Sequence, residues 1–422
     1  MESEQRNKNG SMRAAHGLAS RLRKKRFTKN AENTAEQSRT FEDTAEPALM
    51  VRGSIDMWFM LIVLALLCFG AVMSFSASAI YAKQHYGEST YFLWRYILFA
   101  VIAIIGTVPF VMFSRPWFWR LFGVCAYAGS VVLLLLVLLI GSEGGGAQRW
   151  IQIGPITIQP SEVAKMAVVL TLALYMSKYE KSIKSDLPGS HSFRYGVIYP
   201  ALIFGFICGL VALEKHISGL MIIGMIGIAV MFMGGTRLKY IFLIIGAIGL
   251  AGVLLILVSD YAQERVTTWL FLEKADPLGS AWQTWQGLYA IGSGGLFGKG
   301  LGNSLQKFGY VSEPQNDFIF TIICEELGFF GALLVVSLFG LLVWRGFKIA
   351  AKAPDRFSSL VVYGLTFKVA LQAILNIAVV TNSMPNTGVS LPFFSSGGTS
   401  LAVQIFEMGI ILSISRYSIQ KR

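Results

Sequence analysis

The chain has 422 residues, a formal net charge of +12, and 14% charged against 54% apolar residues. Soluble domains average about 25% charged residues, so this composition lacks the polar surface that a water-soluble protein of this length needs. With a mean hydropathy of +0.58 and repeated apolar runs long enough to span a bilayer, it indicates a polytopic membrane protein. It excludes a soluble enzyme, a secreted disulfide scaffold and a disordered regulator.

The excess of basic residues does not indicate nucleic-acid binding, because most of them flank apolar runs, as the positive-inside rule predicts. The cysteines stand far apart in apolar surroundings, and no CxxC pair occurs among them, so neither a zinc site nor a redox centre is suggested. They are Cys68, Cys125, Cys208 and Cys324.

Residues 1–50 are polar and contain the basic run Arg21–Arg26. No apolar h-region or small-residue cleavage site follows, so this segment is not a signal peptide. We expect a mostly disordered cytoplasmic tail that either touches anionic lipid head groups or serves only to orient the chain in the membrane.

Residues 51–422 form the second expected unit, an all-α membrane domain of about ten helices. The predicted spans are 57–80, 92–113, 119–141, 162–178, 195–213, 217–235, 239–259, 317–345, 359–384 and 397–415. With the N-terminus inside, 26 of the 36 Lys and Arg residues fall on the inner side and nine on the outer side, while Lys368 lies within a span. This partition predicts that both termini are cytoplasmic.

The largest outer segment runs from about 260 to 316, between the seventh and eighth spans. A loop of this length is uncommon unless it is functional. It holds Asp276, Gln286 and the glycine-dense stretch 291–302, whose glycines would let the backbone approach a ligand or take positive φ. The stretch is not a Walker A loop, because Gly300 stands where Ser or Thr should follow Lys299. An irregular loop lying on the membrane is the alternative.

A second outer segment, 146–165, combines Arg149 and Gln159 with a Ser161–Glu162 pair that resembles a helix start, since Ser is a good N-cap. Glu162 and Lys165 are three residues apart and share a helix face. Ionisable groups at the beginning of an apolar span are costly and are functional candidates. The alternative is an ion pair that only seats this helix end.

Other polar groups interrupt the spans. Residues 214–216 suggest a tight outer turn, while Glu325, Glu326, Lys368 and Glu407 should not face lipid. The stretch 386–400 is polar and broken by Pro and Gly, so at membrane depth it must line a cavity or be buried in protein. Together these features predict an outward-opening polar groove, which suits an amphiphile with a charged head and a lipid tail.

The motifs that carry these groups resemble those of the FtsW/RodA/SpoVE (SEDS) family, and the opening span resembles the division and sporulation (FtsW and SpoVE) branches. The matching segments are GAQRWIQIGPITIQPSEVAK (146–165), ADPLGSAWQTWQGLYAIGSGGLFGKGLGNSLQK (275–307), SEPQNDFIFTIICEELG (312–328) and NTGVSLPFFSSGGTSL (386–401). Two places depart from the family pattern: Ser396, where many members have Tyr, and Gln315–Asn316, where a His-Thr pair is common.

The resemblance implies a ten-helix peptidoglycan glycosyltransferase of the bacterial cytoplasmic membrane that polymerises lipid II on the outer face. It implies a class B penicillin-binding protein and other division or elongation proteins as partners, and no nucleic acid. The family's essential aspartate falls on Asp276, and its motif Glu and Lys fall on Glu162 and Lys165; these three are the expected catalytic residues. The candidate substrate-binding residues are Arg149, Gln159, Ser161, Gln286, Lys299, Asp317 and Ser395.

For this chemistry a carboxylate would take the proton of an acceptor hydroxyl, and a positive group would face the departing diphosphate. No residue is assigned to a resident metal, although Mg²⁺ or Mn²⁺ could accompany the diphosphate. Pro277 biases Asp276 toward an extended conformation; alternatively, Asp276 only caps the following turn. Two other functions remain open: a lipid II flippase that uses the same groove, and a non-catalytic division scaffold.

Overall fold

The computed structural model describes residues 50–144, 147–154, 156–185, 191–276, 278–279, 281–395 and 397–419. The tail expected over residues 1–50 lies, except for Met50, outside the described residues. Arg52–Ser418 form one compact unit, and the fold below is the fold of that unit.

Helices occupy all ten stretches in which the sequence predicts a span. In chain order they are α2 (Met57–Tyr86), α3 (Tyr91–Phe113), α4 (Pro116–Ile140), α5 (Pro160–Lys178), α8 (Tyr199–Leu213), α9 (Ile217–Met233), α10 (Leu238–Val258), α13 (Ile319–Ala351), α14 (Arg356–Val380) and α15 (Gly398–Ser415). Within the described residues, eight helices are long and apolar enough to cross a membrane, one of them being α8 together with the π-helix η1 before it. The remaining two, α5 and α9, have 19 and 17 residues. The protein is therefore a multi-pass membrane protein.

Shorter elements connect these helices. They are β1 (Met50–Arg52), β2 (Ser142–Gly144), β3 (Ala147–Ile153), β4 (Ile156–Ile158), α6 (Glu180–Lys184), α7 (His191–Phe193), η1 (Arg194–Ile198), α11 (Asp260–Leu270), α12 (Trp282–Gly294) and β5 (Tyr417–Ile419). Strands β2, β3 and β4 form an antiparallel sheet that leads into α5, with Ile151 opposite Ile158.

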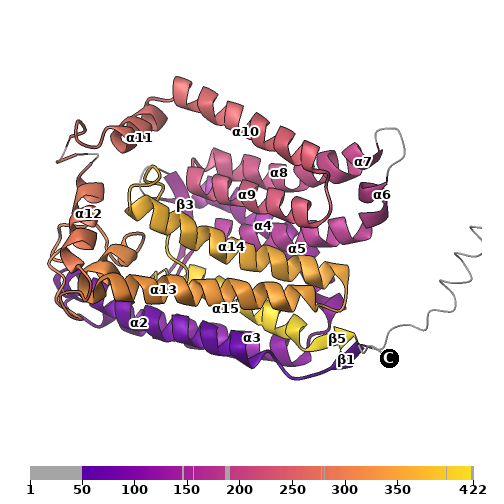
Figure 1. Ribbon diagram of the computed structural model, residues 1–422, viewed down its shortest axis with the longest axis horizontal. Coiled ribbons are helices and arrows are strands. Elements are labelled where there is room, and N and C mark those ends of the chain that lie inside the picture. The colour runs from indigo at the N-terminus through magenta and orange to yellow at the C-terminus, as the bar shows by residue number, and fades with distance from the viewer. Residues whose placement is uncertain are drawn as a thin grey trace, which may run out of the picture. The chain divides into compact units, whose positions relative to one another are not determined.

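The centre of the bundle is formed by α14 and α5. Helix α14 packs against α5, α9 and α13, and α5 also packs against α4 and α8 (Figure 1). In its most apolar stretch 67% of the residues of α14 are buried, against 6% for α10. Polar side chains on α5 or α14 are thus shielded from lipid, as expected for ionisable residues in a membrane bundle.

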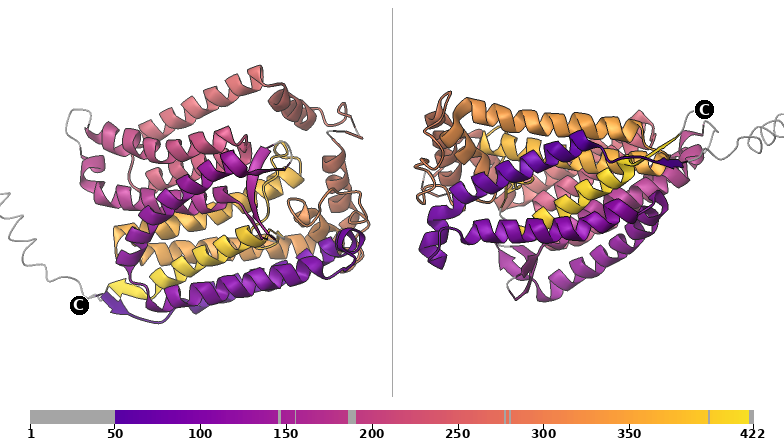
Figure 2. Two further views of the ribbon diagram at one scale, coloured as in Figure 1. Left: turned by 180° about the vertical axis from the view of Figure 1, so that it is seen from behind. Right: turned by 90° about the horizontal axis from the view of Figure 1, so that it is seen from below.

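The two segments assigned to the outer side lie at the same end of the bundle. The β2–β3–β4 sheet and α12 lie at one end of the long helices, while α6 and α7 lie at the other, and the reverse view agrees (Figures 1 and 2). The sequence analysis assigned no helices to residues 260–316, but the structure forms α11 and α12 there. Helix α11 begins after Ser259, whose side chain accepts a hydrogen bond from the Ala262 N–H at 3.4 Å.

The broken stretch between α14 and α15 is buried in protein, as predicted. Leu391, Phe393 and Phe394 are almost fully buried, and Phe393 has a positive φ of 66°. The Tyr96 hydroxyl donates a hydrogen bond to the Phe393 carbonyl at 2.7 Å. Gly70 of α2 permits this approach, because a Cβ at that position would lie 2.2 Å from the same carbonyl oxygen. The Tyr96 hydroxyl of α3 and the close approach at Gly70 of α2 thereby fix the path of this segment.

Candidate functional site

Helix α5 begins two residues earlier than the Ser161–Glu162 pair suggested. Its N-cap is Gln159, and Pro160 occupies the first turn, where a residue without an N–H and with a fixed φ is well suited. The expectation that Ser161 acts as the N-cap was therefore wrong. The Ser161 side chain is 1% exposed and its Oγ has no hydrogen-bond partner.

The first turn of α5 carries a buried ion pair. Lys165 Nζ lies 2.6 Å from Glu162 Oε1, and the two side chains are 2% and 7% exposed. The i, i+3 spacing predicted this shared face. Burying a charge is costly unless it is paired, so the ion pair predicted from the sequence is present. Its presence is consistent both with a role in catalysis and with a purely structural role at the start of α5.

Two further charges complete the pair into what we call the bundle cluster: Glu162, Lys165, Lys368 and Glu407. Lys368 of α14 lies 2.6 Å from Glu407 Oε1 of α15 and 3.8 Å from Glu162 Oε2. Both added side chains are fully buried. The cluster joins α5, α14 and α15 and has no net charge when all four groups are ionised, which is the arrangement a low-dielectric interior tolerates.

The turn between α8 and α9, which the sequence analysis assigns to the outer side and which we call the outer turn, lies beside the cluster and holds polar atoms without a hydrogen-bond partner. Glu214 and His216, in the tight turn between α8 and α9, are 2% and 7% exposed. Both Glu214 carboxylate oxygens and His216 Nδ1 are buried without a hydrogen-bond partner. Buried polar groups in proteins are nearly always hydrogen-bonded, so these three atoms stand out as unused hydrogen-bonding capacity next to the cluster.

Burial also changes the protonation of these two side chains. It raises the pKa of Glu214 to about 8, although the nearby positive charge of Arg149 opposes the shift. It lowers the pKa of His216 to about 4, and repulsion from Arg149 and Lys165 acts in the same direction. Near neutral pH the turn therefore presents a carboxylic acid and a neutral imidazole. Both are suited to hydrogen-bonding an uncharged hydroxyl or amide.

Asp317 lies just before α13, against the broken stretch. Burial raises its pKa to about 6, while Arg265 opposes the shift. Asn376 donates hydrogen bonds to the carbonyls of Asp317 and Val389 at 2.6 and 2.7 Å, and a Cβ on Gly388 would lie 3.6 Å from Asp317 Oδ2. Asp317 thus belongs to the wall formed by the 386–390 segment.

Asp276 lies apart from the bundle cluster. It is exposed, and its Oδ1 accepts a hydrogen bond from the Leu278 N–H at 3.0 Å. This is the turn-capping contact that the sequence offered as the alternative; Pro277 lies outside the described residues. Among the described contacts, no hydrogen bond or ion pair joins Asp276 to Glu162 or Lys165, so their joint action stays a prediction.

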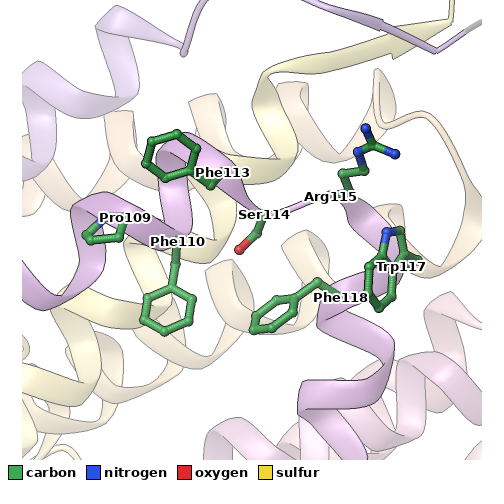
Figure 3. Close-up of a pocket in the computed structure, with 7 residues that line it drawn as sticks. All are labelled: Pro109, Phe110, Phe113, Ser114, Arg115, Trp117 and Phe118. Atoms are coloured by element: carbon green, nitrogen blue, oxygen red, sulfur yellow. The ribbon is translucent and has the colours of Figure 1, made fainter.

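A cavity of about 410 Å³ adjoins Asp276 in the chain. It is lined by Glu264, Thr267, Thr268, Phe271, Lys274 and Ala275. Another cavity of about 420 Å³ lies at the turn between α3 and α4, lined by Pro109, Phe110, Phe113, Ser114, Arg115, Trp117 and Phe118 (Figure 3). The first cavity combines charged and hydroxyl side chains beside a candidate base, whereas the second is mainly aromatic and has no acidic residue in its lining.

The glycine-dense stretch is folded onto the protein itself. Gly298 and Gly328 both have positive φ, and a Cβ on Gly298 would lie 2.1 Å from the Glu326 carbonyl oxygen. The N–H groups of Lys299 and Gly300 donate to the carbonyls of Glu325 and Glu326, each at 2.9 Å. Gly328 makes a kink in α13, and the glycines allow the loop backbone to approach that kink closely. The N–H groups of Lys299 and Gly300 are therefore already hydrogen-bonded within the protein.

Carboxylates at this kink organise what we call the loop cluster: Ser76, Lys299, Ser304, Lys307, Glu325 and Glu326. Lys299 lies 2.7 Å from Glu325, and Lys307 lies 2.9 Å from Glu326. Ser304 Oγ donates to Glu325 at 2.5 Å, and Ser76 Oγ donates to Glu326 at 2.7 Å. Lys299, a candidate for substrate binding, is thus paired within the protein, with its side chain 31% exposed.

The remaining candidates are dispersed. Gln286 is half-buried on α12, and Ser395 Oγ accepts a hydrogen bond from the Gly397 N–H at 3.4 Å. Gln159 is the N-cap of α5, and Arg149 lies on β3, close enough to Glu214 to influence its pKa. Glu214 and His216 were not among the candidates. Their interruption of two apolar runs was the available signal, and it had been interpreted only as a turn.

Comparison with known proteins gives a consistent result. Residues 57–420 match the FtsW/RodA/SpoVE family of cell cycle proteins. Stage V sporulation protein E of Bacillus subtilis is 41% identical over 370 residues, which cover 86% of this chain and 98% of that protein. A probable peptidoglycan glycosyltransferase FtsW of Trichlorobacter lovleyi is 36% identical over 363 residues, covering 85% and 93%.

Solved structures share the fold. A chain from a peptidoglycan synthase complex, described for its coordination of polymerization and crosslinking, superposes with a TM-score of 0.69 at 25% identity, covering 86% of this chain and 98% of that one. The rod shape determining protein RodA of Thermus thermophilus superposes with a TM-score of 0.62 at 26% identity, covering 86% and 97%.

Proposed function

Because the chain belongs to the FtsW/RodA/SpoVE family of cell cycle proteins, we propose that it is a peptidoglycan glycosyltransferase that polymerises lipid II on the outer face of the cytoplasmic membrane. Cell division or sporulation is the process that its relatives favour, since stage V sporulation protein E and FtsW proteins are among them. The observation that carries the proposal is the buried bundle cluster beside unsatisfied polar atoms of the outer turn.

The reaction joins two lipid-linked disaccharides. The 4-hydroxyl oxygen of the acceptor sugar attacks the anomeric carbon of the donor, a new C–O bond forms, and the bond to the diphosphate breaks. The hydroxyl proton goes to a base, and the bonding electron pair leaves with the diphosphate. We assign the base to Asp276, the exposed carboxylate of the outer segment, which is accessible to a substrate in a way that the buried Glu162 is not.

Lys165 and Arg149 are suited to the departing diphosphate, because a fixed positive charge stabilises the negative charge that develops on it. Glu162 holds Lys165 in place through the 2.6 Å ion pair. Protonated Glu214 and neutral His216 can hydrogen-bond the sugar without repelling the diphosphate. Asp317, Ser395 and, from α12, Gln286 are the further residues that we propose to contact the substrate.

A divalent cation would be bound mainly by the substrate. No three His, Cys, Asp or Glu side chains come together as ligands in the described part of the chain. Asp276 would supply one carboxylate ligand and the diphosphate the other oxygens, which suits Mg²⁺ or Mn²⁺. When bound, the ion would neutralise the leaving group. The Asp276 carboxylate would then both accept the proton and bind the ion.

The proposed orientation places both termini in the cytoplasm and the 260–316 segment outside, as the distribution of Lys and Arg predicts. Cysteine labelling of intact cells tests it, with the native cysteines replaced by serine. Exposed Asn303→Cys should react with a membrane-impermeant reagent, and exposed Lys352→Cys should not. The reverse pattern would overturn the orientation and with it the outer active site.

A class B penicillin-binding protein is the proposed partner, since a structural relative comes from a complex that coordinates polymerization with crosslinking. Copurification after coexpression tests the partner. The activity is tested with purified protein and labelled lipid II: glycan polymer supports the transferase. Movement of lipid II across vesicle membranes without polymer would favour a flippase, and neither activity would favour a scaffold.

A further inference from the structure

The bundle cluster contains a lysine that the proposed chemistry does not yet use. Lys368 is fully buried in α14, the most buried of the candidate spans. Its Nζ lies 2.6 Å from Glu407 Oε1 and 3.8 Å from Glu162 Oε2. Glu162 Oε1 is in turn 2.6 Å from Lys165. Each oxygen of Glu162 therefore faces a different lysine.

This geometry makes Glu162 the shared partner of two cations from different helices. Glu407 supplies the hydrogen-bonded partner that holds Lys368, and the longer contact to Glu162 Oε2 is electrostatic. Glu162 Oε2 and Glu407 Oε2 have no hydrogen-bond partner. The orientation of the Glu162 carboxylate thus depends on charges from α5 and α14 together, and a shift of Lys368 would let Glu162 turn away from Lys165.

A purely structural role predicts a different outcome. Buried ion pairs are often replaceable by apolar residues of similar volume with no loss of stability, whereas removing one partner is strongly destabilising. The Lys368–Glu407 pair can therefore be removed as a unit without leaving an unpaired charge. Stability alone gives little reason for this pair to lie beside Glu162.

We propose that Lys368, held by Glu407, is a positioning residue for Glu162 in glycosyl transfer. The inference rests on the proposed function, and its effect passes through the Glu162–Lys165 pair. Lys368 itself touches neither substrate nor reacting atoms. The proposal predicts a fall in kcat, because a displacement of about 1 Å in a catalytic group can cost about 100-fold in rate.

The test uses full-length protein and a lipid II polymerisation assay. Lys368→Met/Glu407→Leu removes both charges together, and we expect kcat to fall about 10- to 100-fold with KM nearly unchanged. Thr366→Val is the matched control, since Thr366 is a fully buried polar residue of the same helix whose Oγ1 has no partner. It should retain wild-type kcat.

A mutant cycle separates positioning from independent effects. Adding Lys368→Met/Glu407→Leu to Glu162→Gln should cost less than about twofold more, because the residue being positioned is already disabled; independent roles would multiply. Wild-type kcat in the charge-pair variant would overturn the proposal while leaving the transferase intact. If Lys368→Met/Glu407→Leu fails to fold while Thr366→Val folds, the charge pair has a structural role, and the proposal is overturned too. Absence of polymer from the wild type would overturn the proposed function and this inference together.

Discussion

The two groups of buried carboxylates differ in how completely the protein satisfies them. In the loop cluster all four carboxylate oxygens of Glu325 and Glu326 accept hydrogen bonds from side chains or backbone amides. In the bundle cluster Glu162 Oε2 and Glu407 Oε2 accept none, and Ser161 and Glu214 beside it are also unsatisfied. The loop cluster is thus fully hydrogen-bonded within the protein, whereas the bundle cluster retains unused hydrogen-bond acceptors.

The largest effect is expected at Asp276, which lies outside both clusters. Asp276→Asn removes the proposed base while keeping the shape and the capping contact to Leu278. Polymerisation should fall by about 10²–10⁴-fold, while lipid II binding changes little. Near-normal polymer synthesis by the folded variant would leave Asp276 as a turn cap and return attention to the bundle cluster.

The second prediction concerns the bundle cluster itself. Lys165→Ala should lower polymerisation by about 10²–10³-fold, the typical cost of removing one group that stabilises developing negative charge. Glu162 and Glu407 then share the charge of Lys368, so the protein should lose some stability but still insert and fold. Detergent-solubilised protein examined by size-exclusion chromatography provides the check. Loss of folded protein would support the helix-seat interpretation.

The third prediction replaces a lysine of the loop cluster by alanine, and we expect a loss of stability without a loss of specific activity. Lys307 is 2.9 Å from Glu326 and also donates to the Gly302 carbonyl at 2.6 Å. Lys307→Ala should destabilise the protein by about 3–5 kcal/mol, because it leaves a buried carboxylate without its cation. Thermal unfolding measures the loss. The specific activity of the protein that remains folded should stay near wild type, and a selective loss of activity would break the comparison.

The smallest effect is a pH dependence that arises at the outer turn. Glu214 has a pKa of about 8 when folded, above its ordinary value of 4.5. The folded protein therefore binds a proton that the unfolded chain has lost, so this contribution to stability is complete below about pH 4.5 and disappears as the pH rises through 8. Glu214→Gln should abolish this decline. Unfolding temperatures measured from pH 5 to 9 on both proteins provide the test, and parallel curves would contradict it.

Hydropathy was sufficient to predict the ten helices, because a helix that crosses the hydrocarbon core is apolar over most of its length. Local spacing was sufficient for the Glu162–Lys165 pair, since both residues lie on one turn. It misplaced the N-cap at Ser161, because the preference of Pro160 for the first turn was overlooked. The helices α11 and α12 were missed for a related reason: they are short and mixed in polarity, so the length of an apolar run does not reveal them.

Tertiary contacts set the limit of sequence reasoning at the site. Lys368 and Glu407 were recognised as residues that avoid lipid, but their pairing with each other, 39 positions apart, and their contact with Glu162 follow from helix packing. The glycine stretch was predicted to approach a ligand or to take positive φ. Gly298, Gly300 and Gly302 do take positive φ, and the close approach that the structure shows is to α13. Asp317 was a candidate from its motif, and only the fold places it against the segment before α15.

The contact between Tyr96 and Phe393 has a consequence for how the protein is made. It joins residues 297 positions apart, whereas the Lys299–Glu325 pair joins residues only 26 apart. During synthesis the fold around Glu325 can therefore form as soon as α13 is in the membrane, but the wall before α15 cannot be fixed until nearly the whole chain has been translated. Contacts between distant segments form late because of the chain entropy they must overcome. A nascent chain would thus form the loop cluster first and the buried segment before α15 last, and a ribosome-bound chain that ends before Phe393 would lack the Tyr96–Phe393 contact.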